Sequence, residues 1–116
     1  LVLDEPTAGL DPRGRRDLRA ILEDIHAHGI TVVQVTHSME DAVRAEQVLV
    51  LNQAKVMLEG SPEEVVSAKN ERMLIEAGLG LPLPLSWAMR LEQAGFSSIG
   101  APLTMDELAR RARQVM

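Results

Sequence analysis

The first third of the chain combines two hydrophobic patterns. A short apolar stretch at residues 1–3 stops at two acidic residues and Pro6, which predicts a strand that ends in a loop. Residues 30–35 are β-branched and nearly all apolar, which is typical of a strand covered on both faces. Between these stretches, apolar residues recur at the three- and four-residue spacing of a helix with one buried stripe: Leu18, Ile21, Leu22 and Ile25. Strand, helix and strand with short joints predict a parallel crossover unit.

Capping signals mark where the helices should begin and end. Asp11 followed by a proline predicts the start of the first helix, and Gly29 predicts its end. Ser38, with Asp41 three residues later, predicts a short helix after the second strand. Ser61, which a proline and two glutamates follow, predicts another helix.

The second half of the chain begins with a hairpin pattern and ends with helices. Residues 48–51 and 55–59 predict two antiparallel strands joined by a tight turn. Glycines and prolines interrupt residues 78–85, so this stretch is expected to be a connector and not an element. Two helical stripes follow, of which one is closed by Gly95 and the other begins with a capping box at Thr104.

Composition narrows the class of protein. The 116 residues carry a net charge of -5, which argues against a protein that binds nucleic acid through an excess of basic residues. Cysteine is absent, which excludes a disulfide scaffold and thiolate metal sites and fits a reducing compartment. No apolar run approaches the ~20 residues of a membrane span.

Asp4 and Glu5 are the first candidates for chemistry. A strand that ends in two carboxylates places them at the edge of a sheet where α/β folds bind ligands. Successive strand residues point to opposite sides, so one carboxylate can face a phosphate-bound Mg²⁺ while the other faces a water. That arrangement suits phosphoryl transfer. The alternative interpretation is a solvated loop after a strand.

His37 follows the second predicted strand, so the crossover would bring it to the same sheet edge as Glu5. A neutral imidazole at that place could contact a phosphate oxygen and help to orient the attacking water. The alternative for His37 is a residue that merely flanks the helix capped by Ser38. Asp11 is explained as an N-cap, but a second role remains open because a cap uses only part of its carboxylate.

Two blocks of sequence resemble ABC-type ATPases. Residues 1–12, LVLDEPTAGLDP, look like the Walker B motif and D-loop of that family, and residues 35–42, VTHSMEDA, look like its H-loop. The hairpin that leads to EGSPEEV at residues 59–65 also matches in order and spacing, so the resemblance covers residues 1–68. The tail, with LPLP at residues 81–84 and LTMDEL at residues 103–108, resembles the C-terminal extension of energy-coupling-factor ATPases. A generic two-helix appendix is the alternative for the tail.

The resemblance implies a fold and a role for each matching residue. The expected fold class is α/β, the C-terminal part of an ABC-type P-loop NTPase with parallel strands, a terminal β-hairpin and a small helical extension. Asp4 would hold Mg²⁺ through water, Glu5 would polarise the hydrolytic water, and His37 would contact the γ-phosphate of ATP. A D-loop that crosses a dimer interface would consist of Gly9, Leu10 and Asp11.

Parts of the family pattern are missing from these residues. No glycine is followed by lysine, so the Walker A motif is absent, and neither the signature motif nor the Q-loop is found. We therefore expect a C-terminal fragment that is inactive alone, with residues 1–68 from the ATPase domain. Residues 69–116 would form a helical extension that could serve in dimerisation.

The leading hypothesis is the motor subunit of an ABC-type, energy-coupling-factor importer. The resemblance implies ATP and Mg²⁺ as cofactors, a second ATPase subunit and a transmembrane subunit as partners, and a position on the cytoplasmic face of the cell membrane. Nucleic acid is not an expected partner. The alternatives are an ABC-type ATPase of a non-transport system, and a non-enzymatic module in which residues 69–116 serve only association or regulation.

Overall fold

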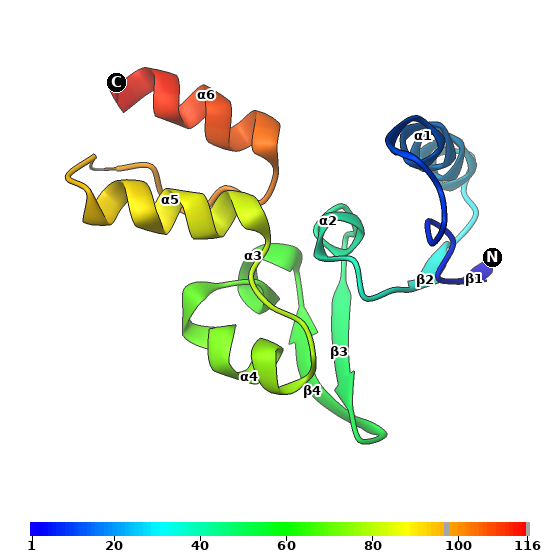
Figure 1. The fold of residues 1–116 in the computed structure, drawn as a ribbon. Coiled ribbons are helices and arrows are strands. Elements are labelled where there is room, and N and C mark those ends of the chain that lie inside the picture. The colour runs from blue at the N-terminus through cyan, green and yellow to red at the C-terminus, as the bar shows by residue number, and fades with distance from the viewer. Residues whose placement is uncertain (97, 116) are drawn as a thin grey trace. The chain divides into compact units, whose positions relative to one another are not determined.

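The computed structural model describes residues 1–96 and 98–115 (Figure 1). The chain divides into two compact units, Leu1–His37 and Ser38–Met116. Within the described residues, no helix is both long enough and apolar enough to cross a membrane. The elements of each unit follow closely from the capping and hydrophobic patterns of the sequence.

The first unit is a parallel crossover. Strand β1 (Val2–Asp4) pairs with strand β2 (Val33–Val35), and helix α1 (Pro12–Ala27) connects them. The register places Val2 beside Val33 and Asp4 beside Val35. The predicted order of strand, helix and strand is therefore confirmed, and the two strands end at the same edge.

Helix α1 begins where its capping signal predicts. The Asp11 side chain accepts a hydrogen bond from the backbone N–H of Gly14 at 2.7 Å, and a proline occupies the first helical position. The helix ends before Gly29, whose φ of +92° belongs to the left-handed region that glycine adopts readily. The predicted buried stripe is only partly correct, because Leu22 is buried whereas Ile21 is 55% exposed.

The second strand differs from its prediction in length and in burial. Strand β2 takes up only the last three residues of the predicted range 30–35. Its apolar residues Val33 and Val35 are about half exposed, at 48% and 53%, and Val2 on β1 is 73% exposed. The expectation of a strand covered on both faces is therefore wrong for this structure. The apolar pattern indicates that the side chains of this strand favour burial, but their actual burial depends on whether other segments pack over the strand.

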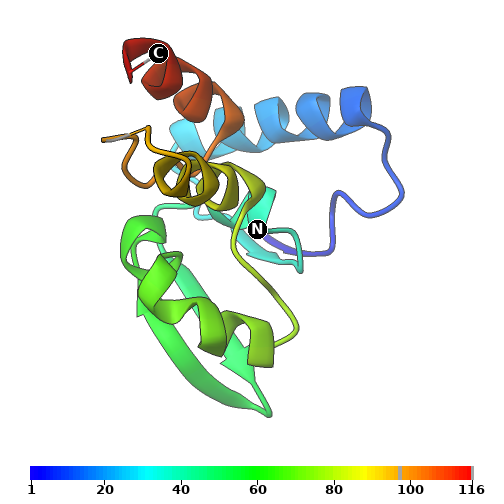
Figure 2. The same cartoon turned by 60° about the vertical axis from the view of Figure 1, so that its left-hand side comes forward.

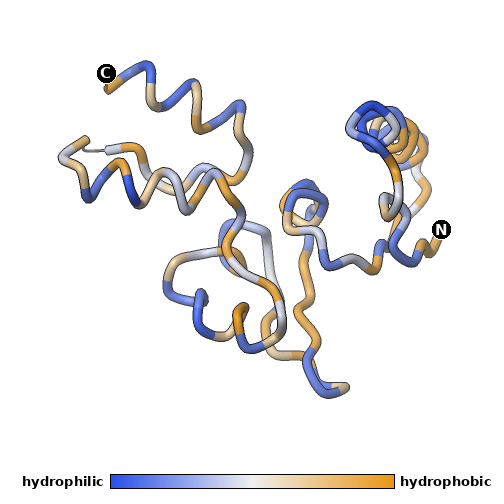
Figure 3. Tube along the Cα trace, viewed as in Figure 1, coloured by the Kyte–Doolittle hydropathy of each residue, from blue (hydrophilic) through white to orange (hydrophobic). Residues whose placement is uncertain are grey.

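The second unit begins with a short helix and a hairpin. Helix α2 (Met39–Ala42) is capped by the Ser38 hydroxyl, which accepts from the Asp41 N–H. Strands β3 (Val48–Asn52) and β4 (Lys55–Gly60) are antiparallel, as predicted. Both turn residues, Gln53 and Ala54, have positive φ, as a two-residue type I′ turn requires. Figure 3 shows the apolar β3 strand running into this hydrophilic turn.

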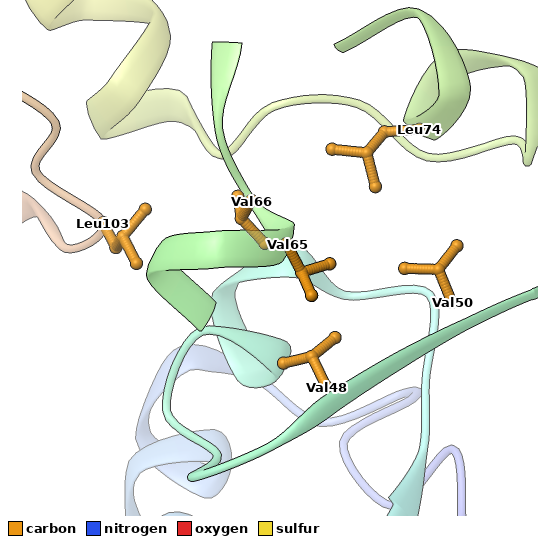
Figure 4. Close-up of a cluster of buried hydrophobic side chains, with 6 residues drawn as sticks. All are labelled: Val48, Val50, Val65, Val66, Leu74 and Leu103. Carbon is orange, nitrogen blue, oxygen red and sulfur yellow. The ribbon is translucent and has the colours of Figure 1, made fainter. Parts of the chain in front are cut away.

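The larger core lies against one face of this hairpin (Figure 4). Helix α3 (Pro62–Val65) is capped by Ser61, and a 3₁₀ turn, η1 (Ala68–Asn70), leads into helix α4 (Glu71–Glu76). These elements and a later loop bring together six buried aliphatic side chains: Val48, Val50, Val65, Val66, Leu74 and Leu103. Residues on both sides of position 68 thus share one core, and the proposed boundary between residues 68 and 69 stays a prediction.

The chain closes with two packed helices, α5 (Leu83–Gln93) and α6 (Met105–Val115), which lie side by side in Figures 1 and 2. Ala88, Ile99 and Leu108 are buried between and beside them. The predicted connector at residues 78–85 is too long, because α5 already begins at Leu83. The prolines do not prevent this, since Pro82 is the N-cap and Pro84 lies in the first turn, where no backbone N–H is needed.

We predict that Leu74→Ala destabilises the second unit by about 2–5 kcal/mol, because Leu74 is fully buried in the larger core and its loss leaves a cavity. Ile75→Ala on the same helix is the matched control, since Ile75 is 58% exposed, and it should cost less than about 0.5 kcal/mol. Urea unfolding of the two variants measures the difference. Equal losses of stability would contradict this assignment of the core.

Candidate functional site

The carboxyl ends of the parallel strands bring two candidate residues together. Directly after β1, the backbone N–H of Glu5 donates to the Val35 carbonyl at 2.7 Å, which extends the parallel pairing by one residue. His37 lies two residues beyond Val35 on the neighbouring chain segment. The edge predicted from the sequence therefore carries both Glu5 and His37.

Glu5 and His37 contact each other directly. The Oε1 atom of Glu5 accepts a hydrogen bond from the His37 backbone N–H at 3.1 Å, and the same oxygen contacts Nδ1 of the His37 ring. The His37 side chain is 84% exposed, whereas that of Glu5 is 34% exposed. Within the described structure, the other carboxylate oxygen of Glu5 makes no hydrogen bond. One oxygen is thus held by His37 and the other remains available to a water.

The backbone of Glu5 adopts an uncommon conformation. Its φ of +47° lies in the left-handed region, which side chains other than glycine rarely occupy. This turn of the chain ends strand β1 while the Glu5 side chain reaches across to His37. The sequence signals the end of the strand through Pro6, but it does not signal the left-handed residue before it.

Asp4, the other carboxylate of the pair, is the last residue of β1 and is exposed. In the part of the chain that the structure describes, the side chain of Asp4 has no hydrogen bond or ion pair. A solvent-facing carboxylate is a hard oxygen ligand of the kind that binds Mg²⁺ while leaving most coordination positions to water and phosphate. Asp4 therefore fits the magnesium role that the resemblance implies.

The loop from Glu5 to Asp11 holds the predicted D-loop residues. Two backbone hydrogen bonds of 3.2 Å fold it, from Ala8 to the Glu5 carbonyl and from Leu10 to the Thr7 carbonyl. Gly9 has a φ of +77°, and a Cβ built at this position would meet nothing within 4 Å. Gly9, Leu10 and Asp11 are all exposed, so they are available to a partner.

Thr7 is the site residue that sequence reasoning missed. It is 6% exposed, and its burial anchors the middle of a loop that is otherwise open to solvent. A lone threonine between Pro6 and Ala8 carries no periodic signal, so only the fold reveals its burial. The described residues, those of the candidate site included, offer no group of three acidic or histidine side chains that could hold a metal. One surface hollow is lined by Glu71, Arg72, Ile75 and Glu76 and contains none of the candidate residues.

Known proteins resemble the chain in sequence and in fold. The energy-coupling factor transporter ATP-binding protein EcfA2 of Bacillus cereus is 43% identical over 119 residues, which cover 100% of this chain and 40% of that protein. EcfA2 of Streptococcus thermophilus is 42% identical over 108 residues, covering 92% of this chain and 38% of its own length. No family model matches the chain.

A solved structure agrees with these relatives. It is cbiO1 from Clostridium perfringens, described as part of the ABC transporter complex cbiONQ, and it matches with a TM-score of 0.55 and 32% sequence identity. The match covers 80% of this chain and 36% of that one. The chain thus spans about 40% of the length of the curated relatives that it matches.

The fold is similar to that of an ABC-type ATP-binding protein. Within that class, the chain is homologous over its whole length to part of the ATP-binding proteins of energy-coupling factor transporters, so the predicted resemblance and fold class are confirmed. The roles of Asp4, Glu5, His37 and the D-loop residues stay predictions.

We predict that Glu5→Ala speeds hydrogen exchange of the His37 backbone amide about 5-fold, because the variant removes the acceptor of a hydrogen bond worth roughly 1 kcal/mol. Glu5→Gln should keep the exchange of the His37 amide slow, since the side-chain amide oxygen of glutamine can also accept the hydrogen bond. Amide exchange followed by NMR measures both, with Glu63→Ala at an exposed position as the control. Unchanged exchange in Glu5→Ala would contradict the hydrogen bond.

Proposed function

We propose that this chain carries the water-activating groups of an ATP-hydrolysing motor subunit in an energy-coupling-factor, ABC-type importer. The observation that supports it most is the meeting of Glu5 and His37 at the ends of two parallel strands. This meeting occurs in a chain 43% identical to the ATP-binding proteins of such transporters. ATP and Mg²⁺ are the proposed cofactors.

The contacts at the site support a separate role for each of the three side chains. His37 holds Oε1 of Glu5, so the other oxygen of the same carboxylate remains available and can accept a proton from a water. Bound Mg²⁺ would neutralise charge on the phosphates, and the exposed carboxylate of Asp4 would hold it through water. The imidazole of His37, which is 84% exposed, can then reach a terminal phosphate oxygen from the same edge.

The proposed partners follow from the resemblance and from the exposure of the loop. Gly9, Leu10 and Asp11 would contact a second ATP-binding subunit across a dimer interface. A transmembrane subunit would be the second partner, to which the motor subunit transmits its motion. The protein would lie on the cytoplasmic face of the membrane. This agrees with the description of cbiO1 as part of an ABC transporter complex.

A chimera tests the proposed activity. In it, residues 1–116 replace the matching segment of Bacillus cereus EcfA2, which supplies the rest of the protein. We predict that Glu5→Gln in the chimera lowers ATP hydrolysis by at least about 100-fold and leaves ATP binding intact, because the amide has the size of the carboxylate but cannot take a proton.

Glu63→Gln is the matched control, since Glu63 is exposed on α3 and should not alter the rate. Hydrolysis is followed by phosphate release, and binding by a fluorescent ATP analogue. A chimera that hydrolyses no ATP would contradict the proposed function. An active chimera with equal rates in both variants would remove Glu5 as the general base.

We also propose that residues 1–116 alone neither bind nor hydrolyse ATP. The motif G-x-x-x-x-G-K-[ST], whose backbone amides and lysine cradle the phosphates, does not occur among these residues. Titration calorimetry with Mg-ATP should therefore show no micromolar binding, whereas the chimera should bind. Micromolar affinity of the 116 residues would contradict this proposal.

A further inference from the structure

The loop between β1 and α1 (Figure 1) contains two overlapping turns that share Thr7. In the first turn, the Ala8 N–H donates to the Glu5 carbonyl at 3.2 Å, and Pro6 and Thr7 are the central residues. In the second turn, the Leu10 N–H donates to the Thr7 carbonyl, also at 3.2 Å. Thr7 is therefore the residue at which the turn that begins at Glu5 joins the rest of the loop.

Thr7 is also the residue that fixes this loop in place. Among residues 5–11, all of which the structure describes, Thr7 alone is buried, at 6% exposed, whereas residues 8–11 are exposed. Buried hydroxyl groups in proteins are as a rule hydrogen-bonded, so a buried threonine resists displacement. A loop that is fixed at one residue holds the backbone on either side of that residue.

Glu5 needs such support because its backbone is strained. A φ of +47° is disfavoured for residues with a Cβ, and such a conformation persists only where the surrounding structure enforces it. The Glu5 N–H donates to the Val35 carbonyl at 2.7 Å, and the Glu5 carbonyl accepts from Ala8. The first of these bonds belongs to the strand pairing, and the second belongs to the turn that Thr7 fixes. If that turn loosened, Glu5 could return to an ordinary φ, and its carboxylate would leave His37.

We propose that Thr7 is a positioning residue for the carboxylate of Glu5. The buried Thr7 side chain fixes the turn, and the turn holds the left-handed backbone of Glu5. This backbone directs Oε1 of Glu5 to the His37 backbone N–H, at 3.1 Å. In this role Thr7 acts through Glu5 and does not touch the reacting atoms. The consequence for hydrolysis rests on the proposed function, in which Glu5 is the general base, whereas the geometric part of the inference does not.

Amide exchange in the 116-residue chain tests the geometry without reference to ATP. Thr7→Ala should speed exchange of the His37 amide about 3-fold, because the hydrogen bond to Glu5 becomes looser but its acceptor is still present. Thr31→Ala is the matched control, since Thr31 is exposed in the same unit and should leave this exchange unchanged. Thr7→Ser, which keeps the buried hydroxyl, should exchange at nearly the rate of the unchanged chain.

A double variant separates positioning from a general loss of structure. In the Glu5→Ala background, the addition of Thr7→Ala should change exchange of the His37 amide less than about 1.5-fold, because Thr7 acts only through the Glu5 side chain. Exchange of the amide of Leu22, which is buried on α1, should stay unchanged in every variant. An unchanged His37 amide in Thr7→Ala, equal speeding of the His37 and Leu22 amides, or full additivity in the double variant would each overturn the proposal.

The chimera with Bacillus cereus EcfA2 tests the consequence for hydrolysis. Thr7→Ala should lower kcat about 10-fold and change KM for ATP less than about 2-fold, because a misplaced base slows the reaction without weakening nucleotide binding. Thr31→Ala should leave both constants unchanged, Thr7→Ser should restore most of kcat, and Thr7→Ala should have no further effect in the Glu5→Gln background.

The two experiments distinguish the possible failures. A raised KM with an unchanged kcat in Thr7→Ala, or a further loss of kcat in the Glu5→Gln background, would overturn the positioning role. A chimera without any hydrolysis would contradict the proposed function, and the exchange of the His37 amide would still decide whether Thr7 positions Glu5.

Discussion

The hydrogen bond from the Glu5 backbone N–H to the Val35 carbonyl is the interaction on which the candidate site depends. It continues the register of β1 and β2 by one residue past the strand, so Glu5 and His37 come into contact at the same edge of the sheet. A slip of one residue in a parallel pair would turn every side chain to the other face. The carboxylate would then point away from the imidazole.

Stability and chemistry reside in different parts of the chain. The larger core, formed by β3, β4, α3, α4 and the Leu103 loop, belongs to the second unit. In the first unit the paired strands leave apolar side chains such as Val2 and Val35 exposed, and the geometry of the site depends on backbone hydrogen bonds and on the Asp11 cap. Two-stranded pairings are only marginally stable without a packed face, so the site is expected to be the more easily loosened part.

Much of the fold and of the candidate site could be predicted from the sequence, because the signals that mark them are local. Caps at Asp11, Ser38 and Ser61 involve residues three positions apart, and all three were predicted correctly. The approach of Glu5 to His37 followed from strand order alone. Burial was harder, because coverage of β2 and the burial of Thr7 depend on segments distant in the sequence. The early start of α5 was missed because prolines that usually interrupt a helix are tolerated in its first turn.

At position 5, the left-handed backbone favours glycine, whereas the proposed reaction needs a carboxylate. Glycine would take a φ of +47° without steric cost, whereas a residue with a Cβ pays of order 1 kcal/mol for it. A glutamate kept at such a position is a residue that a search for stabilising substitutions would replace first. The same replacement would remove the carboxylate through which Glu5 contacts His37, so engineering this chain for robustness and preserving its chemistry lead to opposite choices at position 5.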